Sequence, residues 1–256
     1  MLRFMSWNGF LRLFFLIAIG LGGTVQAAEP SAPKPSEYAP ADDLVRQADR
    51  YLKDLNDAVA CESEFKDSES KVANTSNALV VIALTLGLHD QPNKYQSSAA
   101  AVMQAARAVA EAREFAAAQK AVARLNAAAE GKVQVAGELR WEKVASLPEL
   151  MKQVPLIHTR LKANLKGNKF CKKAAETAGY TAVLAAIAQG TMADTSAAKN
   201  AEQEKQWRQF SINARQCAAA VNAAIHRADP KAADEAMKKL NQSCEDCHAV
   251  FHPTLN

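Results

Sequence analysis

The sequence has little of what β-sheets and tight turns require. Aromatic residues make up 6% of the chain, and glycine and proline are sparse after residue 40, whereas alanine is abundant. Because alanine and leucine lose little entropy in a helix, and strands depend on β-branched and aromatic residues, this composition disfavours sheets. It predicts an all-α fold of packed helices.

The chain also lacks a strong net charge. Its formal charge is +4 over 256 residues, and the loss of Arg3 and Arg12 with a leader would lower it further. Nucleic-acid-binding surfaces need a marked excess of basic residues, so the charge gives no case for a nucleic acid partner. The length suits one large domain or two of roughly 100 residues each.

The first 27 residues have the pattern of a cleaved signal peptide. Arg3 supplies the positive end, residues 13–25 are apolar, and Val25 and Ala27 offer small residues where a signal peptidase reads. The alternative, a retained membrane anchor, would need roughly 20 apolar residues, more than the run contains. We therefore expect a mature chain without a membrane span, in the periplasm or another oxidising, extracytoplasmic space.

A proline-rich segment follows, and after it the helical pattern occurs as two similar copies. Residues 28–40 contain four prolines and predict an extended linker. The segment ALVVIA at 78–83 resembles VLAAIA at 183–188, and each half offers four helical segments with mostly short connections. We predict two tandem antiparallel four-helix bundles, at residues 41–135 and 143–256. The alternative is one irregular α-domain whose alanine-rich helices only look alike.

Turn signals place the helices of the second half. Asp229 and Pro230 break the chain before the last helix, where proline fits the first turn. Pro155 falls inside the first helix and should kink it. The expected helices are residues 147–166, 170–189, 202–227 and 231–252.

The run Cys-Glu-Asp-Cys-His at residues 244–248 is the chemically informative motif. Residues three apart share a helix face, so Cys244 and Cys247 can both reach the vinyl groups of one porphyrin edge. His248 follows directly and can coordinate the iron as proximal ligand. This pattern is the signature of c-type haem attachment and predicts one covalent haem c, with thioethers to Cys244 and Cys247.

A dithiol redox centre and a zinc site are the alternative interpretations of the motif. A redox C-x-x-C usually opens a helix in a βαβ setting, and this sequence predicts no strands. A structural zinc needs a second ligand pair. His252 could join His248 as that pair, but four ligands on one helix are too compact for an easy tetrahedron.

With this motif on its last helix, the second half resembles class II cytochromes c of the cytochrome c prime type. In that family a four-helix bundle carries C-x-x-C-H near its C-terminus, and an aromatic residue follows three positions after the histidine, as Phe251 does here. An arginine usually comes next, where this chain has His252. That departure removes the family's usual charge contact near a haem propionate.

The first half shows the resemblance more weakly and lacks the motif. Aligning Asn126 with Asn241 places three residues opposite Cys244, Cys247 and His248 that can form neither thioether nor iron ligand. These are Ala129, Lys132 and Val133. We therefore predict a degenerate, haem-free bundle that fills its pocket with side chains or serves for docking or spacing.

The ligand opposite His248 decides the function. Met151 lies near the start of the first helix of the second half, the same bundle end as His248. The resemblance also implies a distal iron ligand here, because low-spin members place an axial methionine early in helix one. Methionine ligation raises the potential and blocks exogenous ligands. The alternative is that Met151 packs in the core.

Other histidines and methionines suit structural roles. His158 lies seven residues after Met151, about 10 Å along the helix axis, which is too far for the same iron position. We expect helix-end capping or packing for four further side chains: His89, His226, Met192 and Met237.

Three cysteines fall outside the motif, namely Cys61, Cys171 and Cys217. In an oxidising compartment, one disulfide and one free thiol is the simplest arrangement. A Cys61–Cys171 bridge would join the two halves, and a Cys171–Cys217 bridge is the local alternative. The sequence does not choose between them.

These patterns together predict a non-enzymatic electron carrier. It would be an extracytoplasmic c-type cytochrome that passes single electrons to redox partner proteins. If the distal position is open, the iron would instead be five-coordinate and bind nitric oxide or carbon monoxide. A third interpretation makes the haem-free bundle the working interface. The resemblance also implies a dimer through helix faces, unless the extra bundle takes that place.

Overall fold

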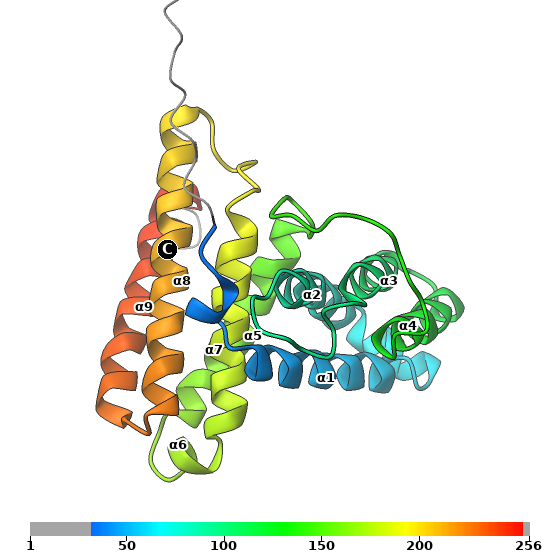
Figure 1. Ribbon diagram of the computed structural model, residues 1–256, viewed down its shortest axis with the longest axis horizontal. Coiled ribbons are helices and arrows are strands. Elements are labelled where there is room, and N and C mark those ends of the chain that lie inside the picture. Colours follow the sequence, from blue (N-terminus) through cyan, green and yellow to red (C-terminus); the bar gives the residue numbers. More distant parts are fainter. Residues whose placement is uncertain (1–31, 253–256) are drawn as a thin grey trace, which may run out of the picture. The chain divides into compact units, whose positions relative to one another are not determined.

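The computed structural model describes residues 32–252, and all regular structure in that range is helical (Figure 1). The absence of strands among these residues confirms the all-α prediction. The expected signal peptide, residues 1–27, lies outside the described residues, as do residues 28–31 of the expected linker.

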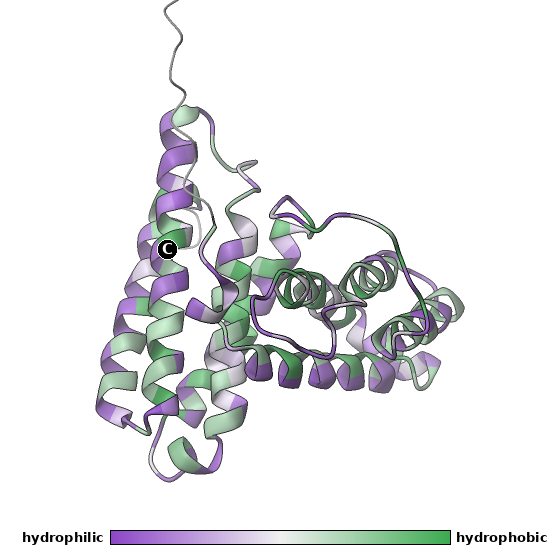
Figure 2. Cartoon of the chain, in the orientation of Figure 1, coloured by the Kyte–Doolittle hydropathy of each residue, from purple (hydrophilic) through white to green (hydrophobic). Residues whose placement is uncertain are grey.

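The first half contains a short 3-10 turn, Pro35–Glu37, followed by four α-helices. They are α1 (Ala41–Ala58), α2 (Glu62–Gly87), α3 (Ala99–Glu111) and α4 (Phe115–Ala129). Helix α2 packs against both α1 and α3, and α3 packs against α4. Hydrophilic residues line one side of α1 and hydrophobic residues line the other (Figure 2), so this helix is amphipathic and lies at the surface.

The second half contains four long helices and one short one. They are α5 (Leu147–Asn164), α6 (Lys169–Lys172), α7 (Ala174–Thr191), α8 (Ala201–His226) and α9 (Pro230–Phe251). The long helices agree with the expected ranges within a few residues, except that Lys173 separates α6 from α7. Helix α7 packs against α5 and α8, and α8 packs against α9. The division into two four-helix bundles stays a prediction.

Helix α9 begins where the turn signals predict. The Asp229 side chain accepts a hydrogen bond from the backbone N–H of Ala232 at 2.9 Å, and Pro230 occupies the first turn. Helix α5 continues through Pro155, whose missing N–H leaves the Met151 carbonyl without its helical donor.

A single hydrophobic core runs through both halves. Helix α1 packs across α7, and α2 packs against α5 and α7. Glycines on α7 allow this close approach, since a Cβ atom on Gly179 would lie 2.5 Å from Nε2 of Gln47 and one on Gly190 would lie 2.9 Å from Val81. Side chains of the first half therefore pack directly on the backbone of α7 at these glycines.

The end of the expected linker is also part of this packed structure. Tyr38 and Ala39 are buried. The His89 ring contacts the Ala39 carbonyl oxygen through Nε2 at 3.0 Å, and Ser36 bonds both carboxylate oxygens of Asp90. These bonds hold the segment before α1 against the end of α2.

Polar bonds also join α1 to the second half. The buried Asp43 carboxylate accepts a hydrogen bond from Asn222 at 2.9 Å and contacts the His226 ring at 2.7 Å. About two turns further on α1, Arg50 donates to the Glu176 carboxylate at 2.7 Å. Because buried polar groups need partners, these bonds specify how α1 is oriented on α7 and α8.

The Glu176 carboxylate has further partners besides Arg50. Tyr180 donates to the same carboxylate at 2.8 Å, and Lys173 pairs with it at 3.1 Å. Burial raises the pKa of Glu176, but the bonds from Arg50, Tyr180 and Lys173 outweigh burial and lower it from 4.5 to about 2.

Replacing Glu176 with glutamine should destabilise the fold at neutral pH but not in strong acid. The carboxylate stabilises the folded state above its ordinary pKa of 4.5, and that contribution is lost as the pH falls through about 2. We expect Glu176→Gln to lower the free energy of unfolding by roughly 1 kcal/mol at neutral pH, because solvent screens this partly exposed pair. Urea denaturation at a series of pH values measures the difference.

The matched control is Glu138→Gln, which alters an exposed carboxylate paired with Arg140. This variant should unfold like the parent protein at every pH. An unchanged unfolding midpoint for Glu176→Gln at neutral pH would contradict the role assigned to the Arg50–Glu176 pair.

Candidate functional site

The last two turns of α9 carry the three motif residues on one face. Cys244, Cys247 and His248 are all partly buried, whereas Glu245 and Asp246 between them are exposed. This division follows from helix geometry, since positions three and four apart share a face and the residues between them point elsewhere. The helix therefore presents two thiols and one imidazole toward the protein interior.

Aromatic side chains hold this end of α9 against α8. The Phe251 ring meets Trp207 edge to face, with ring centroids 5.1 Å apart, and meets Phe210 in the same way at 6.2 Å. Trp207 is buried, and its Nε1 donates to the Thr191 carbonyl at the end of α7 at 2.9 Å. The end of α9, the start of α8 and the end of α7 therefore lie together.

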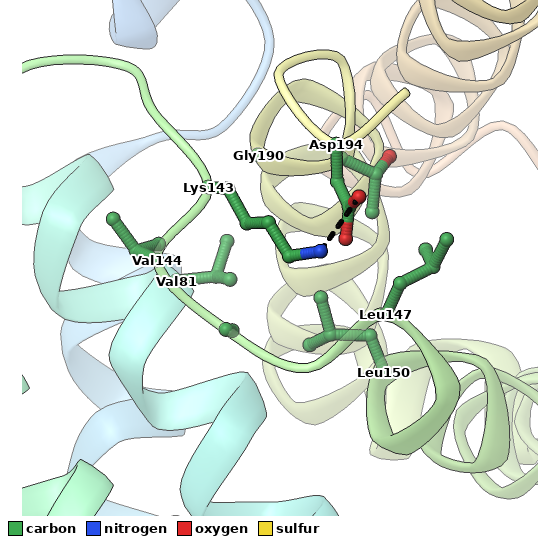
Figure 3. A pocket seen from close by; sticks show the side chains of 9 residues that line it. Val81, Lys143, Val144, Leu147, Leu150, Gly190 and Asp194 are labelled. Atoms are coloured by element: carbon green, nitrogen blue, oxygen red, sulfur yellow. Dashed lines mark hydrogen bonds and ion pairs between the residues drawn. The ribbon is translucent and has the colours of Figure 1, made fainter. Parts of the chain in front are cut away.

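The start of α5 lies at the same end. Leu147 and Leu150 of α5 face Gly190 and Thr191 of α7 across a cavity of about 10 Å³ (Figure 3). Helices α5 and α9 therefore run antiparallel, with the start of one and the end of the other at the same end.

One contact between α5 and α9 sets their register. The His158 ring lies 2.5 Å from the amide oxygen of Asn241 through Nε2. Seven residues, or about two turns, lead from there to Met151 in one direction and to His248 in the other. Met151 and His248 therefore lie at the same level of two antiparallel helices.

Helix α5 packs mainly against α2 and α7 rather than against α9. Met151 is partly buried and packs against the hydrophobic core. The structure therefore places Met151 and His248 at the same level, and the role of Met151 as an iron ligand stays a prediction.

Burial sets the protonation of the motif side chains. It raises the pKa of Cys244 and of Cys247 to about 11, with a smaller contribution to Cys244 from Cys217. Burial also lowers the pKa of His248 below its ordinary 6.5, and nearby His252 adds to this effect. At neutral pH the two thiols are protonated and the imidazole is uncharged.

The cavity beside α5 is lined by a buried carboxylate. Asp194 is buried, and its Oδ1 accepts bonds from Lys143 Nζ at 3.0 Å and from the Ser196 N–H at 3.2 Å (Figure 3). Its other oxygen, Oδ2, is buried without a protein partner. The cavity volume is close to that of one water molecule, so it suits a single bridging water rather than a substrate.

The remaining histidines and methionines have structural partners. His89 contacts the Ala39 carbonyl, which precedes α1 and is not at the end of its own helix α2, and His226 pairs with Asp43. Met237 is buried in the core of the second half. In the first half, α4 ends at Ala129, so Lys132 and Val133, which align with Cys247 and His248, follow the helix.

The expected disulfide does not form. All five cysteines are free, with Cys61 and Cys171 exposed and Cys217 partly buried. Neither the Cys61–Cys171 nor the Cys171–Cys217 pairing occurs. Asn222, five residues after Cys217, contacts Thr181 in the middle of α7. Cys217 therefore lies away from the start of α7 and from Cys171, which is in α6 just before it.

Sequence reasoning missed the aromatic contact and the position of Cys217. No role was predicted for Trp207 and Phe210, although they are three residues apart on one helix face, as Cys244 and Cys247 are. A seven-residue spacing also links Phe210 to Cys217 and Cys244 to Phe251. These matched spacings on neighbouring helices were the available signal.

Comparisons with known proteins give no independent assignment, since no family model, curated protein or solved structure matches the chain. Across residues 32–252, no three or more histidine, cysteine and acidic side chains are grouped so that they could hold a metal ion. None of the helices described above is both long and apolar enough to cross a membrane.

Removing the Phe251 ring should loosen the end of α9. We expect Phe251→Ala to lower the free energy of unfolding by about 2 kcal/mol, since it removes a partly buried ring and two edge-to-face contacts. The neighbouring Val250→Ala is the matched control, because Val250 is 42% exposed. Urea denaturation followed by circular dichroism measures both, and equal effects would contradict the aromatic contact.

Proposed function

We propose that the protein is an extracytoplasmic c-type cytochrome that carries one covalent haem on α9 and transfers single electrons. The observation that carries the proposal is the arrangement of Cys244, Cys247 and His248 on one partly buried face at the end of a long helix. The proposal includes export by the signal peptide at residues 1–27 and two tandem four-helix bundles, of which the first is free of haem. It includes no enzymatic activity.

The chemistry of the three side chains fits this group. A thioether forms when a protonated thiol adds across a vinyl group, and burial keeps both thiols protonated at neutral pH. An iron ligand must be an uncharged imidazole, and burial disfavours the charged form of His248. The donor set thus has the protonation states that attachment and ligation require.

The chain's own residues would have distinct tasks around this group. Cys244 and Cys247 would hold it covalently, and His248 would supply the proximal iron ligand. Phe251, packed on Trp207 and Phe210, would keep the last turn of α9 in place and shield it from water. A bound haem would supply the one-electron centre that none of these side chains offers.

Met151 is the proposed distal ligand because the His158–Asn241 contact sets it level with His248. In this arrangement the iron would be six-coordinate, and the thioether would favour electron transfer over the binding of small gases. Redox partner proteins would then meet the end of the second half where α5 begins and α9 ends.

One observation favours a second candidate function. Met151 packs on the hydrophobic core, and its helix α5 packs mainly against α2 and α7 rather than against α9. If Met151 stays there, the iron would be five-coordinate and the protein would bind nitric oxide or carbon monoxide. Sensing or scavenging of such gases is therefore the alternative.

The attachment can be tested directly. When the full chain is expressed with a c-type haem maturation system, acid-acetone extraction should leave the haem on the protein. Mass spectrometry should locate it on the peptide that contains Cys244 and Cys247. A Cys244→Ser, Cys247→Ser variant should lose covalent haem, whereas the Cys61→Ser, Cys171→Ser control should keep it. Complete extraction of the haem from the parent protein would refute the proposal.

The distal ligand needs a separate test. A Met151 ligand predicts a low-spin spectrum that carbon monoxide does not change, and Met151→Ala should make the haem high-spin and responsive to the gas. Met192→Ala is the control, because Met192 is also partly buried but lies in the connection after α7. A parent protein that is already high-spin and binds carbon monoxide would instead support the five-coordinate candidate.

A further inference from the structure

Three of the five cysteines lie on the adjacent helices α8 and α9, and the proposed function uses only two of them. Cys217 on α8 is partly buried, like Cys244 and Cys247 on α9. Both Cys217 and Cys244 pack against the hydrophobic core. The proposed haem attachment gives Cys217 no role.

The ring contact between Phe210 and Phe251 sets a helix register in which Cys217 and Cys244 are expected to face each other. The two rings meet across the α8–α9 interface with centroids 6.2 Å apart. Helices α8 and α9 run antiparallel, since only a three-residue turn separates them. Seven residues complete about two turns and return to nearly the same face, so one such step leads from Phe210 to Cys217 and from Phe251 to Cys244.

Two further observations agree with this register. The Cys217 thiol contributes, after burial, to the raised pKa of Cys244, which agrees with positions on facing helices. The buried face of α9 includes the small residues Ala233, Ala236 and Ser243. Small side chains allow a neighbouring helix to approach closely.

Helix geometry disfavours the competing pair within the motif. Residues three apart on a helix have Cβ atoms about 5–6 Å apart. A disulfide requires about 3.5–4.5 Å between Cβ atoms. A Cys244–Cys247 bond would therefore unwind the end of α9, whereas a bond to Cys217 joins two helices that can both stay intact.

We propose that Cys217 is a redox partner of Cys244 and that a disulfide between them closes the attachment site. In this step both thiols lose their protons, one Cys217–Cys244 bond forms, and the two electrons reduce a disulfide oxidant such as glutathione disulfide to two thiols. The effect on attachment rests on the proposed function, because a thioether needs the S–H bond of Cys244. A thiol reductant reverses the step and reopens the site.

The disulfide is tested on the full chain prepared without haem. After treatment with glutathione disulfide and digestion with trypsin, mass spectrometry should find the Cys217 peptide joined to the peptide with Cys244 and Cys247. The link should persist in Cys247→Ser and in the control Cys171→Ser, and should disappear in Cys217→Ser and Cys244→Ser. A bond between Cys244 and Cys247, a bond to Cys171, or no bond at all would overturn the pairing.

Attachment is tested by adding ferrous haem to reduced and oxidised protein. Oxidised parent protein should acquire no more covalent haem than Cys244→Ser, and a thiol reductant should restore attachment. Cys217→Ser treated with the same oxidant should attach haem as well as the reduced parent, and equal attachment by oxidised and reduced parent would overturn the closure. If the reduced parent attaches no haem while the cross-linked peptide forms, the proposed function fails and the disulfide stands.

Discussion

Close packing of small residues along α7 is the constraint on which the rest of the structure depends. Every residue of this helix from Thr177 to Thr191 is buried, so its surface is covered on all sides. Glycines at 179 and 190 leave room for Gln47 of α1 and Val81 of α2. A side chain at either position would clash with these residues unless they shifted.

The same helix positions the candidate site through a chain of contacts. Its last carbonyl, at Thr191, accepts the indole N–H of Trp207, and Trp207 packs on Phe251 at the end of α9. The end of α9 that carries the motif is thus held against α8, and through Trp207 it is connected to the end of α7. This support matters for the proposed haem, because thioethers and an iron ligand require side chains that a rigid helix presents together.

Local signals were enough for the helices and the motif but not for the pairing of side chains. The start of α9 follows from Asp229 and Pro230, which act on their own neighbours in the chain. Neither disulfide suggested at Cys171 is present. The sequence left this open, because it does not show which cysteines on different helices lie together. The Asp43–His226 contact, which spans 183 residues, had no sequence signal either.

The sequence by itself determined that the chain is helical, where the long helices begin, and that Cys244, Cys247 and His248 share a face. These are local properties, because a helix is stabilised by residues within one or two turns. Only the tertiary structure decided that both halves share a core, that His158 of α5 contacts Asn241 of α9, and that Trp207 packs on Phe251. Those features depend on how helices pack and in which register, and packing is decided by side chains far apart in the chain.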